Sequence, residues 1–381
     1  MNKVIPYGGQ FIDFKDIKSV SKSLKNNLIS GGGVIKKFEK KLSNYLQVKH
    51  TLSCSSGTAA LHLSFAALGV KKNDIIIMPI INFISSYNMC SSLGAKIFFT
   101  DVDSKTGQMT PQNLIDCIKK NNIKKIKAIV TMYMGGYPEN IIDFYKLKKK
   151  YNFKIVEDCC HALGAKYKVE NNIFSIGSCK HSDIATFSLH PLKPITTGEG
   201  GLITTNDKKI YERASLMRSH GILKSKKFHW KYDVIKSGYN YRLSDINCAL
   251  GYSQLNKIKK FIDKRKKIYY FYKKSLDGYR KIINFPNYNE NIFPSYHLVI
   301  ININFKNLKQ KDKFFKYLIN NSIMCQFHYI PINKFSIFKN KNEKFYSSEI
   351  YYKTSLSIPI FHQISSKQLR NVVDKIKKYF D

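Results

Sequence analysis

The chain has 381 residues, of which 43% are hydrophobic and 24% charged, so it can bury a sizeable core and is neither disordered nor collagen-like. No stretch approaches the roughly 18 apolar residues that a membrane-spanning helix requires. The N-terminal segment also lacks the apolar core of a secretion signal. We therefore expect a globular protein without a membrane partner.

The charge is strongly basic. Lys and Arg number 64 against 26 Asp and Glu, which gives a formal net charge of +38 and is compatible with a nucleic-acid-binding protein. Only six of the basic residues are arginines, whose forked guanidinium is the usual reader of bases. A lysine-rich coding bias explains the composition at least as well, so we expect no nucleic-acid partner. The same field would favour a phosphorylated substrate.

The eight cysteines form no CxxC pair. Together with the absence of an export signal, this favours reduced thiols and a cytoplasmic protein. The cysteines and histidines between residues 159 and 181 do not have the spacing of a zinc site, so no metal is expected.

From residue 15 to 250 the sequence alternates helical and strand-like patterns. Helices are predicted at 17–28 and 34–46, and residues 50–68 are predicted to form a strand, a turn and a helix. Further strands are predicted at 74–80, 95–103, 126–133, 154–159, 184–190 and 200–207. Apolar strands separated by helices indicate α/β architecture, with a mostly parallel central sheet covered by helices. Ligands of such proteins bind at the carboxyl ends of the strands.

The composition changes after about residue 254. A long lysine-rich helix is predicted at 255–276, followed by a strand at 297–305 and a helix at 310–321. A second strand is predicted at 323–332 and a C-terminal helix at 366–380. We therefore expect a large domain, 1–254, and a smaller α+β C-terminal lobe, 255–381, that includes the linking helix.

The strongest local motif is SLHPLKPITTGEGG at 188–201. Lys193 lies between two prolines, which restrict the backbone, and precedes glycines that let a bulky ligand approach closely. This is a suitable setting for a lysine that forms a Schiff base with a carbonyl group. The alternative, a surface lysine beside a turn, is not excluded by this segment alone.

A second motif, KIVEDCCHALGA at 154–165, places Glu157 and Asp158 at the end of a buried strand, with His161 close behind. A carboxylate at this position faces the ligand crevice of an α/β sheet and can keep a pyridine nitrogen protonated. A helix N-cap role for Asp158 is the alternative that the motif leaves open.

A third motif places Ser56, Gly57 and Thr58 directly before a helical run. Hydroxyl groups and unbonded N–H groups at a helix start bind phosphate, although ordinary capping is the alternative. A pyridoxal-phosphate enzyme needs a phosphate-binding helix start, an aromatic residue, an acid and a lysine. This chain has all four in that order, with Phe83 as the aromatic residue.

Nearly the whole chain resembles the DegT/DnrJ/EryC1/StrS aminotransferases, which are fold-type-I pyridoxal-phosphate transferases acting on nucleotide-linked keto-sugars. The resemblance rests on GGGVIKKFE (31–39), SSGTAAL (55–61), EDCCHALGA (157–165), HPLKPITTGEGG (190–201), MRSHGI (217–222), GYNYRLSDINCALG (238–251) and HYIPI (328–332). It implies pyridoxal 5′-phosphate as the cofactor and a homodimer with shared active sites.

The resemblance also implies roles for individual residues. Lys193 matches the lysine that binds the cofactor covalently, and a related dehydratase branch has histidine there, so Lys193 favours transamination. Asp158 matches the partner of the pyridine nitrogen. His161 matches the residue beside the cofactor's 3-oxygen, and Phe83 matches the aromatic that stacks on the ring.

Further matches concern the phosphate and the substrate. The residues that match phosphate contacts are Ser56, Gly57, Thr58 and Ser188, with Asn240 reaching the phosphate from the second subunit. His328 and Tyr329 match substrate-facing positions, and Arg242 matches a position that is either structural or substrate-facing.

Within the family, residues 190–201 are most similar to enzymes of pseudaminic acid biosynthesis. This likeness implies amination at C4 of a UDP-linked 2-acetamido-2,6-dideoxy-4-keto-hexose, with L-glutamate as the donor. A TDP- or GDP-linked keto-sugar is the main alternative. A basic nucleic-acid-binding protein and a pyridoxal-phosphate-binding regulator are more distant ones, and no separate helix-turn-helix segment supports the regulator.

Overall fold

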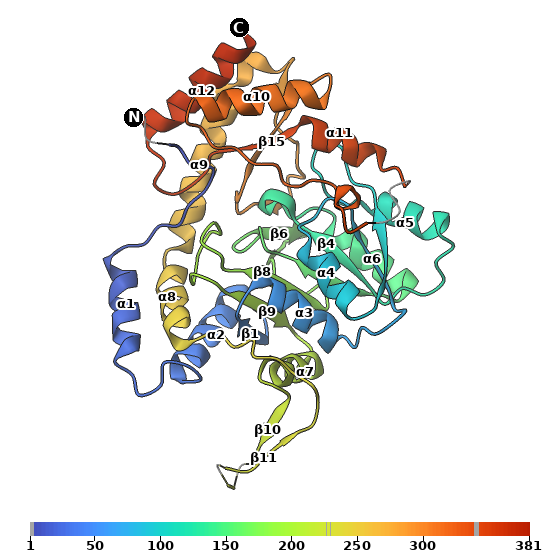
Figure 1. Cartoon of the computed structure of the whole chain (residues 1–381), viewed down its shortest axis with the longest axis vertical. Coiled ribbons are helices and arrows are strands. Elements are labelled where there is room, and N and C mark those ends of the chain that lie inside the picture. Colours follow the sequence, from blue (N-terminus) through green and yellow to red (C-terminus); the bar gives the residue numbers. More distant parts are fainter. Residues whose placement is uncertain (1–3, 226, 229, 339–342) are drawn as a thin grey trace.

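The structure is a computed structural model that describes residues 4–225, 227–228, 230–338 and 343–381. A seven-stranded sheet forms its centre (Figure 1). In sheet order its strands are β1 (His50–Cys54), β9 (Gly201–Thr205), β8 (Ile184–Ser188), β5 (Lys154–Asp158), β4 (Ala128–Met132), β2 (Ile75–Pro79) and β3 (Lys96–Thr100). Only β9 runs against the others, which confirms the mostly parallel sheet expected from the apolar runs.

Helices cover both faces of this sheet because successive strand residues point to opposite faces. Ile76 and Met78 of β2 pack with α3, α4 and α7, whereas Ile77 between them packs with α5 and α6. Farther along the sheet, α2 and α8 cover this second face. The covering helices are α2 (Gly33–Leu46), α3 (Gly57–Ala67), α4 (Ser85–Ser92), α5 (Pro111–Lys120), α6 (Ile141–Tyr151), α7 (Lys208–Arg218) and α8 (Asp245–Leu255).

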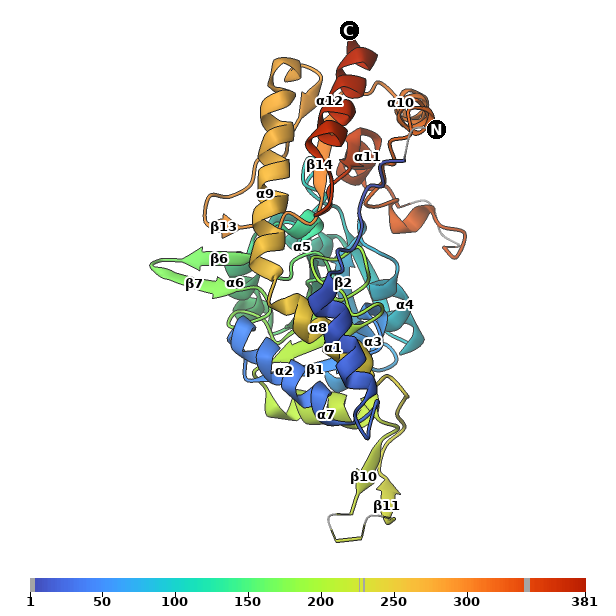
Figure 2. The ribbon, with the colours of Figure 1, turned by 90° about the vertical axis from the view of Figure 1, so that its left-hand side faces the viewer.

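The C-terminal elements build a second, smaller sheet in the order β12-β14-β15, with helices beside it. These elements are α9 (Ile258–Ser275), β12 (Ile283–Asn284), β14 (Val299–Ile303), α10 (Leu308–Asn320), α11 (Tyr346–Thr354), β15 (Ser355–Ile358) and α12 (Ser366–Phe380). Figure 2 shows α9 running from the large sheet to these elements. The helix predicted at 255–276 is thus α9, which begins three residues later, after α8 has ended.

The strand predicted at 323–332 is wrong. That segment makes only isolated bridges, Ile5 with Ile323 and Gln326 with Ser357, and the strand beside β14 is β15. The segment is irregular because His328 is turned inward to bond Ser357, and a regular alternation of side chains is lost.

Two hairpins and an N-terminal helix complete the fold. β6 (Lys166–Val169) and β7 (Asn172–Ser175) pair with β13 (Ile292–Phe293). β10 (Ile222–Lys224) and β11 (Tyr232–Val234) form an arm that projects from the body (Figures 1 and 2). Helix α1 (Phe14–Leu24) lies against α8, where buried Asp16 accepts hydrogen bonds from Gln254 and Lys257. In the part of the chain that the structure describes, no helix is long and apolar enough to cross a membrane.

Candidate active site

The predicted site residues follow strands that end at one edge of the large sheet. β5 and β8 are parallel, with Asp158 paired to Thr186, so the segments that follow them leave the sheet side by side. β1 runs in the same direction on the far side of β9, and its end leads into α3. The start of α3, the segment after Asp158 and the loop with Lys193 are therefore neighbours.

The start of α3 has the donors that a phosphate needs. Ser56 caps the helix by accepting a hydrogen bond from the N–H of Ala59 at 3.0 Å, so the capping interpretation is correct for this residue. The N–H groups of Gly57 and Thr58 bond no acceptor within the described segments. Thr58 Oγ1 lies 2.8 Å from Ser85 Oγ, which adds hydroxyl groups beside these amides. The helix dipole makes the same point favourable for an anion.

Close packing holds this helix start in place. A Cβ atom added at Gly57 would lie 3.0 Å from Cβ of Ser188, and one added at Gly201 would lie 2.1 Å from the carbonyl oxygen of Ser56. Larger side chains there would push α3 away from the ends of β8 and β9. Ser188 itself accepts a hydrogen bond from the N–H of His190 at 3.3 Å, so its hydroxyl proton remains available to a ligand.

Asp158 is a buried carboxylate without a basic partner. It is 3% exposed, and its two oxygens accept hydrogen bonds from Ser86 Oγ at 3.1 Å and from the N–H of Cys160 at 3.2 Å. No ion pair joins it to any lysine, arginine or histidine among the described residues. The residues after Asp158 form turns rather than a helix, so the N-cap alternative is wrong. A buried anion of this kind is suited to a cationic ring nitrogen.

His161 is held as a neutral ring in one tautomer. The N–H of Gly135 donates to Nδ1 at 3.3 Å, which assigns the ring proton to Nε2, and Nε2 then donates to the Tyr329 hydroxyl oxygen at 3.0 Å. Burial, with smaller effects from Lys193 and His328, holds the pKa of His161 well below its usual value. The hydroxyl proton of Tyr329 is therefore left to point into the site.

Lys193 lies in the loop after β8, where its N–H donates to the carbonyl of His190 at 2.9 Å. Burial lowers the pKa of its amine, while Cys160 and Asp158 act in the opposite direction. The buried Arg265 guanidinium lowers this pKa further. A lowered pKa increases the fraction of neutral amine, the form that attacks carbonyl groups and accepts protons.

Phe83 lies in the loop between β2 and α4 and is 53% exposed, which is unusual for so large an apolar ring. Its centroid is 5.7 Å from that of Tyr329. So exposed a ring is available to stack on a flat aromatic ligand such as the predicted cofactor ring.

His328 lies behind Tyr329. Its Nδ1 is 2.8 Å from Ser357 Oγ, and burial, aided by Lys193, lowers its pKa to about 3. Its ring centroid is 5.9 Å from that of His161. The structure thus brings His328, Tyr329, His161 and Lys193 into one cluster.

The structure does not bring every predicted residue into this cluster. Asn240 is exposed and pairs with Ser219, while the next residue, Tyr241, accepts a hydrogen bond from the N–H of Ser55 at 2.9 Å. The side chain of Arg242 is partly buried and makes no ion pair with a described acid. Both residues lie near the β1–α3 turn without contacting Asp158 or His161.

Sequence reasoning missed three contributors to the cluster. Ser86 bonds Asp158 from α4, Gly135 fixes the tautomer of His161, and the ring of Tyr7 lies 5.9 Å from that of His328. Gly135 and Gly136 both have left-handed φ values, which glycine adopts readily. This pair of glycines was the one indication in the sequence that the turn contributes to the site. No motif marks Ser86 or Tyr7.

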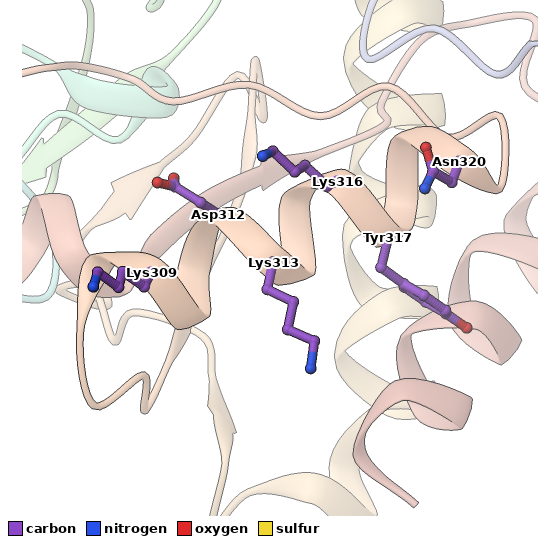
Figure 3. Close-up of a pocket in the computed structure, with 6 residues that line it drawn as sticks. All are labelled: Lys309, Asp312, Lys313, Lys316, Tyr317 and Asn320. Carbon is purple, nitrogen blue, oxygen red and sulfur yellow. The ribbon is translucent and has the colours of Figure 1, made fainter.

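A hollow of about 530 Å³ lies elsewhere, beside α10. Lys313 and Tyr317 point to one side of the helix in Figure 3, and Asp312 and Lys316 to the other. These side chains do not converge on a common point, so this hollow is a weaker candidate for the active site than the cluster around Lys193. Within the described ranges, no group of three or more His, Cys, Asp or Glu side chains is placed to hold a metal ion.

Comparison with known proteins decides the family. Residues 10–377 match the DegT/DnrJ/EryC1/StrS aminotransferase family. The chain belongs to this family. It is therefore a pyridoxal-phosphate-dependent aminotransferase of the sugar-transaminase type, which confirms the family, fold and cofactor predicted from the sequence.

The relatives of this aminotransferase include a UDP-4-amino-4,6-dideoxy-N-acetyl-beta-L-altrosamine transaminase of Campylobacter jejuni. It is 35% identical, over 98% of this chain and 99% of the relative. A GDP-perosamine synthase of Escherichia coli is 30% identical, over 99% of each chain. Among solved structures, Helicobacter pylori PseC, an aminotransferase involved in the biosynthesis of pseudaminic acid, superposes with a TM-score of 0.91 at 28% identity and covers 99% of both chains.

Proposed function

We propose that this aminotransferase places an amino group at C4 of a UDP-linked 2-acetamido-2,6-dideoxy-4-keto-hexose, with L-glutamate as the donor. The observation that carries the proposal is the clustering of Lys193, the unpaired carboxylate of Asp158 and the His161–Tyr329 pair at one sheet edge. The substrate is supported by the Campylobacter relative at 35% identity and by the similarity to PseC.

The donor set of the chain fits the cofactor. Bound pyridoxal phosphate supplies the reactive aldehyde carbon and an electron sink. The amides of Gly57 and Thr58 would hold its phosphate, together with the Ser56 and Ser188 segments, and Lys193 would hold its aldehyde carbon. Asp158 would accept a hydrogen bond from the ring N–H, while Phe83 would cover one face of the ring.

Lys193 also moves a proton in this proposal. After the donor has taken its place, the neutral amine of Lys193 accepts the proton from the α-carbon of glutamate and delivers it to the C4′ carbon of the cofactor. In the second half of the cycle the same amine would move a proton in the reverse direction, from C4′ of the cofactor to C4 of the sugar. Asp158 would keep the ring nitrogen of the cofactor protonated in both halves of the cycle.

The sugar side of the site is uncharged. His328 is neutral at physiological pH, and burial raises the pKa of the Tyr329 phenol well above its usual value. Neutral donors and aromatic faces are suited to hydroxyl and acetamido groups of a hexose. Arg242 is a candidate for the anionic diphosphate of the nucleotide.

We further propose a homodimer in which Asn240 reaches the partner's phosphate site. Phe14, Ile17, Leu24 and Leu28 form an exposed apolar stripe on and after α1, and the arm exposes further apolar residues, Leu223, Tyr232 and Val234. Apolar surface of this extent is typical of a protein interface. In the proposed dimer a second copy covers this surface, and the exposed Asn240 contacts the phosphate site of the partner.

Two further assignments belong to this proposal. Residues 1–254 form the cofactor-binding domain and residues 255–381 the smaller domain, with α9 as the link. The eight unpaired thiols are compatible with a cytoplasmic location.

The test follows both half-reactions in the absorbance spectrum of the holoenzyme. L-Glutamate should convert the bound cofactor to its amino form, and the UDP-linked keto-sugar should restore the starting spectrum. TDP- and GDP-linked 4-keto-sugars serve as matched controls. The Escherichia coli relative at 30% identity makes a GDP-linked sugar the second candidate. Restoration by that sugar alone would replace the UDP assignment, and no change with glutamate would remove glutamate as the donor.

A further inference from the structure

The inner face of α10 carries a lysine at a position of the core. Lys311, Phe314 and Leu318 are the buried residues of this helix, and their spacing places them on one helical face. Lys311 is only 1% exposed. A lysine is rarely buried to this extent unless an acid pairs with it. In the part of the chain that the structure describes, no acid forms an ion pair with Lys311, and the neighbouring Asp312 is exposed.

Two aromatic rings and a carbonyl group surround the ammonium group instead. Nζ of Lys311 lies 4.0 Å from the ring centroid of Phe327 and 4.3 Å from that of Tyr352. It also donates a hydrogen bond to the backbone carbonyl of Tyr352. The faces of aromatic rings attract a cation, and the attraction is stronger where water is excluded. Lys311 therefore joins the segment after α10 to helix α11, and we call these three residues the cation clamp.

Both rings of the cation clamp adjoin residues of the active-site cluster. Phe327 directly precedes His328 and Tyr329 in the chain. Tyr352 directly follows Tyr351, whose hydroxyl donates to the carbonyl of His328 at 2.8 Å. The backbone of His328 is thus fixed from two directions, by the peptide that follows Phe327 and by the phenol of Tyr351. Movement of either ring of the clamp would displace this segment.

The cation clamp acts on one side of the active site. The Tyr329 hydroxyl lies 3.0 Å from Nε2 of His161, and a displacement of about 1 Å would break this hydrogen bond. Asp158 ends β5 and Lys193 follows β8, so both are placed by the large sheet instead. Loss of the clamp should therefore disturb the substrate side of the site and leave the cofactor side in place.

We propose that Lys311 is a positioning residue that holds the His328–Tyr329 segment in place for the keto-sugar. The proposal rests on the proposed function, because that function assigns this segment to the sugar. Lys311 touches neither reactant and acts only through the two rings of the cation clamp.

The strength of the cation clamp depends on the charge of Lys311, which changes near neutral pH. Burial lowers the pKa of Lys311 to about 7, while Asp312 opposes this shift and Lys334, 5.4 Å from the centroid of Tyr352, adds to it. Burial raises the pKa of the Tyr352 phenol and lowers that of His328 to about 3, so both stay neutral around pH 7. A neutral amine loses the attraction of the rings, so the clamp weakens as pH rises through about 7.

The experiment compares two substitutions of Lys311 with the wild type in the separate half-reactions. Lys311→Met keeps a long side chain and removes the charge, so KM for the UDP-linked keto-sugar should rise by about 3- to 10-fold. Lys311→Arg keeps a charge that aromatic rings also attract, so this KM should stay within about twofold of the wild-type value. The rate at which glutamate converts the bound cofactor should change by less than about twofold in both variants.

Lys313→Met, at an exposed position on the same helix, is the matched control and should change neither quantity. Thermal unfolding of each variant separates positioning from stability, because a purely structural role would lower the melting temperature and leave KM for the sugar unchanged. The proposal is overturned by an unchanged KM in Lys311→Met, by an equal loss in both half-reactions, or by a KM that Lys311→Arg does not restore.

A pH series on the wild type gives a test that does not depend on the folding of Lys311→Met. Between pH 6 and 8.5, KM of the wild type for the keto-sugar should rise by about threefold or more as Lys311 loses its charge. In Lys311→Arg it should stay constant, since the guanidinium remains charged. A wild-type KM that does not rise, or that rises equally in Lys311→Arg, would contradict the proposal.

Failure of the proposed function gives a different result. There the wild type itself does not use the UDP-linked sugar at any pH. The comparison of Lys311→Met, Lys311→Arg and Lys313→Met is then made by the same criteria with whichever nucleotide keto-sugar restores the spectrum of the bound cofactor.

Discussion

The active site has two sides that are built differently. The floor consists of the start of α3, Asp158 and Lys193, all placed by strands of one sheet and packed against each other. The wall contains Tyr7 and Phe83, which come from separate segments and are exposed or only partly buried. In our proposal Asn240 and Arg242 also belong to it. The floor is complete within one chain, whereas the wall is open where the reactants enter and where we place the second copy.

The largest effect should come from the floor. Lys193→Ala removes the amine that holds the cofactor and moves the proton, so kcat should fall by at least about 10⁴-fold. Steady-state kinetics and the absorbance of the bound cofactor measure this loss. Lys378→Ala, on the exposed end of α12, is the control. Turnover that survives Lys193→Ala would contradict the assignment of the floor.

The next effect concerns charge on the floor. Asp158→Asn keeps an acceptor for Ser86 but removes the negative charge, so kcat should fall by about 10²-fold while the melting temperature changes little. Asp374→Asn, exposed on α12, is the matched control. Equal activity of Asp158→Asn and the wild type would mean that the carboxylate does not act on the ring nitrogen.

A smaller effect tests whether the wall is shared between subunits. Asn240→Ala should weaken cofactor binding by about tenfold through loss of a hydrogen bond to a charged phosphate. Hybrid dimers of Lys193→Ala and Asn240→Ala subunits should contain one intact site and one doubly altered site, so they should recover about half of the wild-type activity. Recovery no greater than the sum of the parent dimers would place Asn240 in its own subunit's site.

The smallest effect is a pH dependence of stability. His161, His297 and His328 are buried, and burial lowers the pKa of each in the folded state. Below a pH of about 6.5 the unfolded chain binds protons that the folded chain does not, so stability falls as pH falls, by up to about 1.4 kcal/mol per pH unit for each histidine. For His328 this loss continues down to a pH of about 3.

Urea unfolding at pH 7.5 and 5.5 measures this dependence. His328→Gln should reduce the difference between the two free energies of unfolding, and His50→Gln, at a partly exposed position on β1, serves as the control. An identical difference in His328→Gln and the wild type would show that His328 does not stay neutral in the folded protein.

The floor could be predicted from the sequence because its residues directly follow apolar strand runs. Asp158 ends such a run, Lys193 follows another, and the helix that starts at Gly57 follows a third. The main sheet was predicted for the same reason. Tyr7 and Ser86 were harder to predict, because they act through contacts between segments that no local pattern links.

The hairpins were missed for a related reason. β6, β7, β10 and β11 are only three or four residues long, so their strand patterns are weak. A strand was wrongly predicted at 323–332 because the segment is apolar. Its apolar residues are buried, but the segment is irregular. In both cases tertiary packing outweighs the local pattern.

The N-terminal segment before α1, which packs against the C-terminal elements at Ile5 and places Tyr7 beside His328, has a practical consequence for preparing the protein. A purification tag attached ahead of residue 1 would extend from a segment whose seventh residue lies beside the site. Such a tag could alter measured sugar affinities without touching any residue of the floor. Asp381 follows α12 at an exposed end of the molecule (Figure 1), which makes the C-terminus the better place for a tag in all the comparisons above.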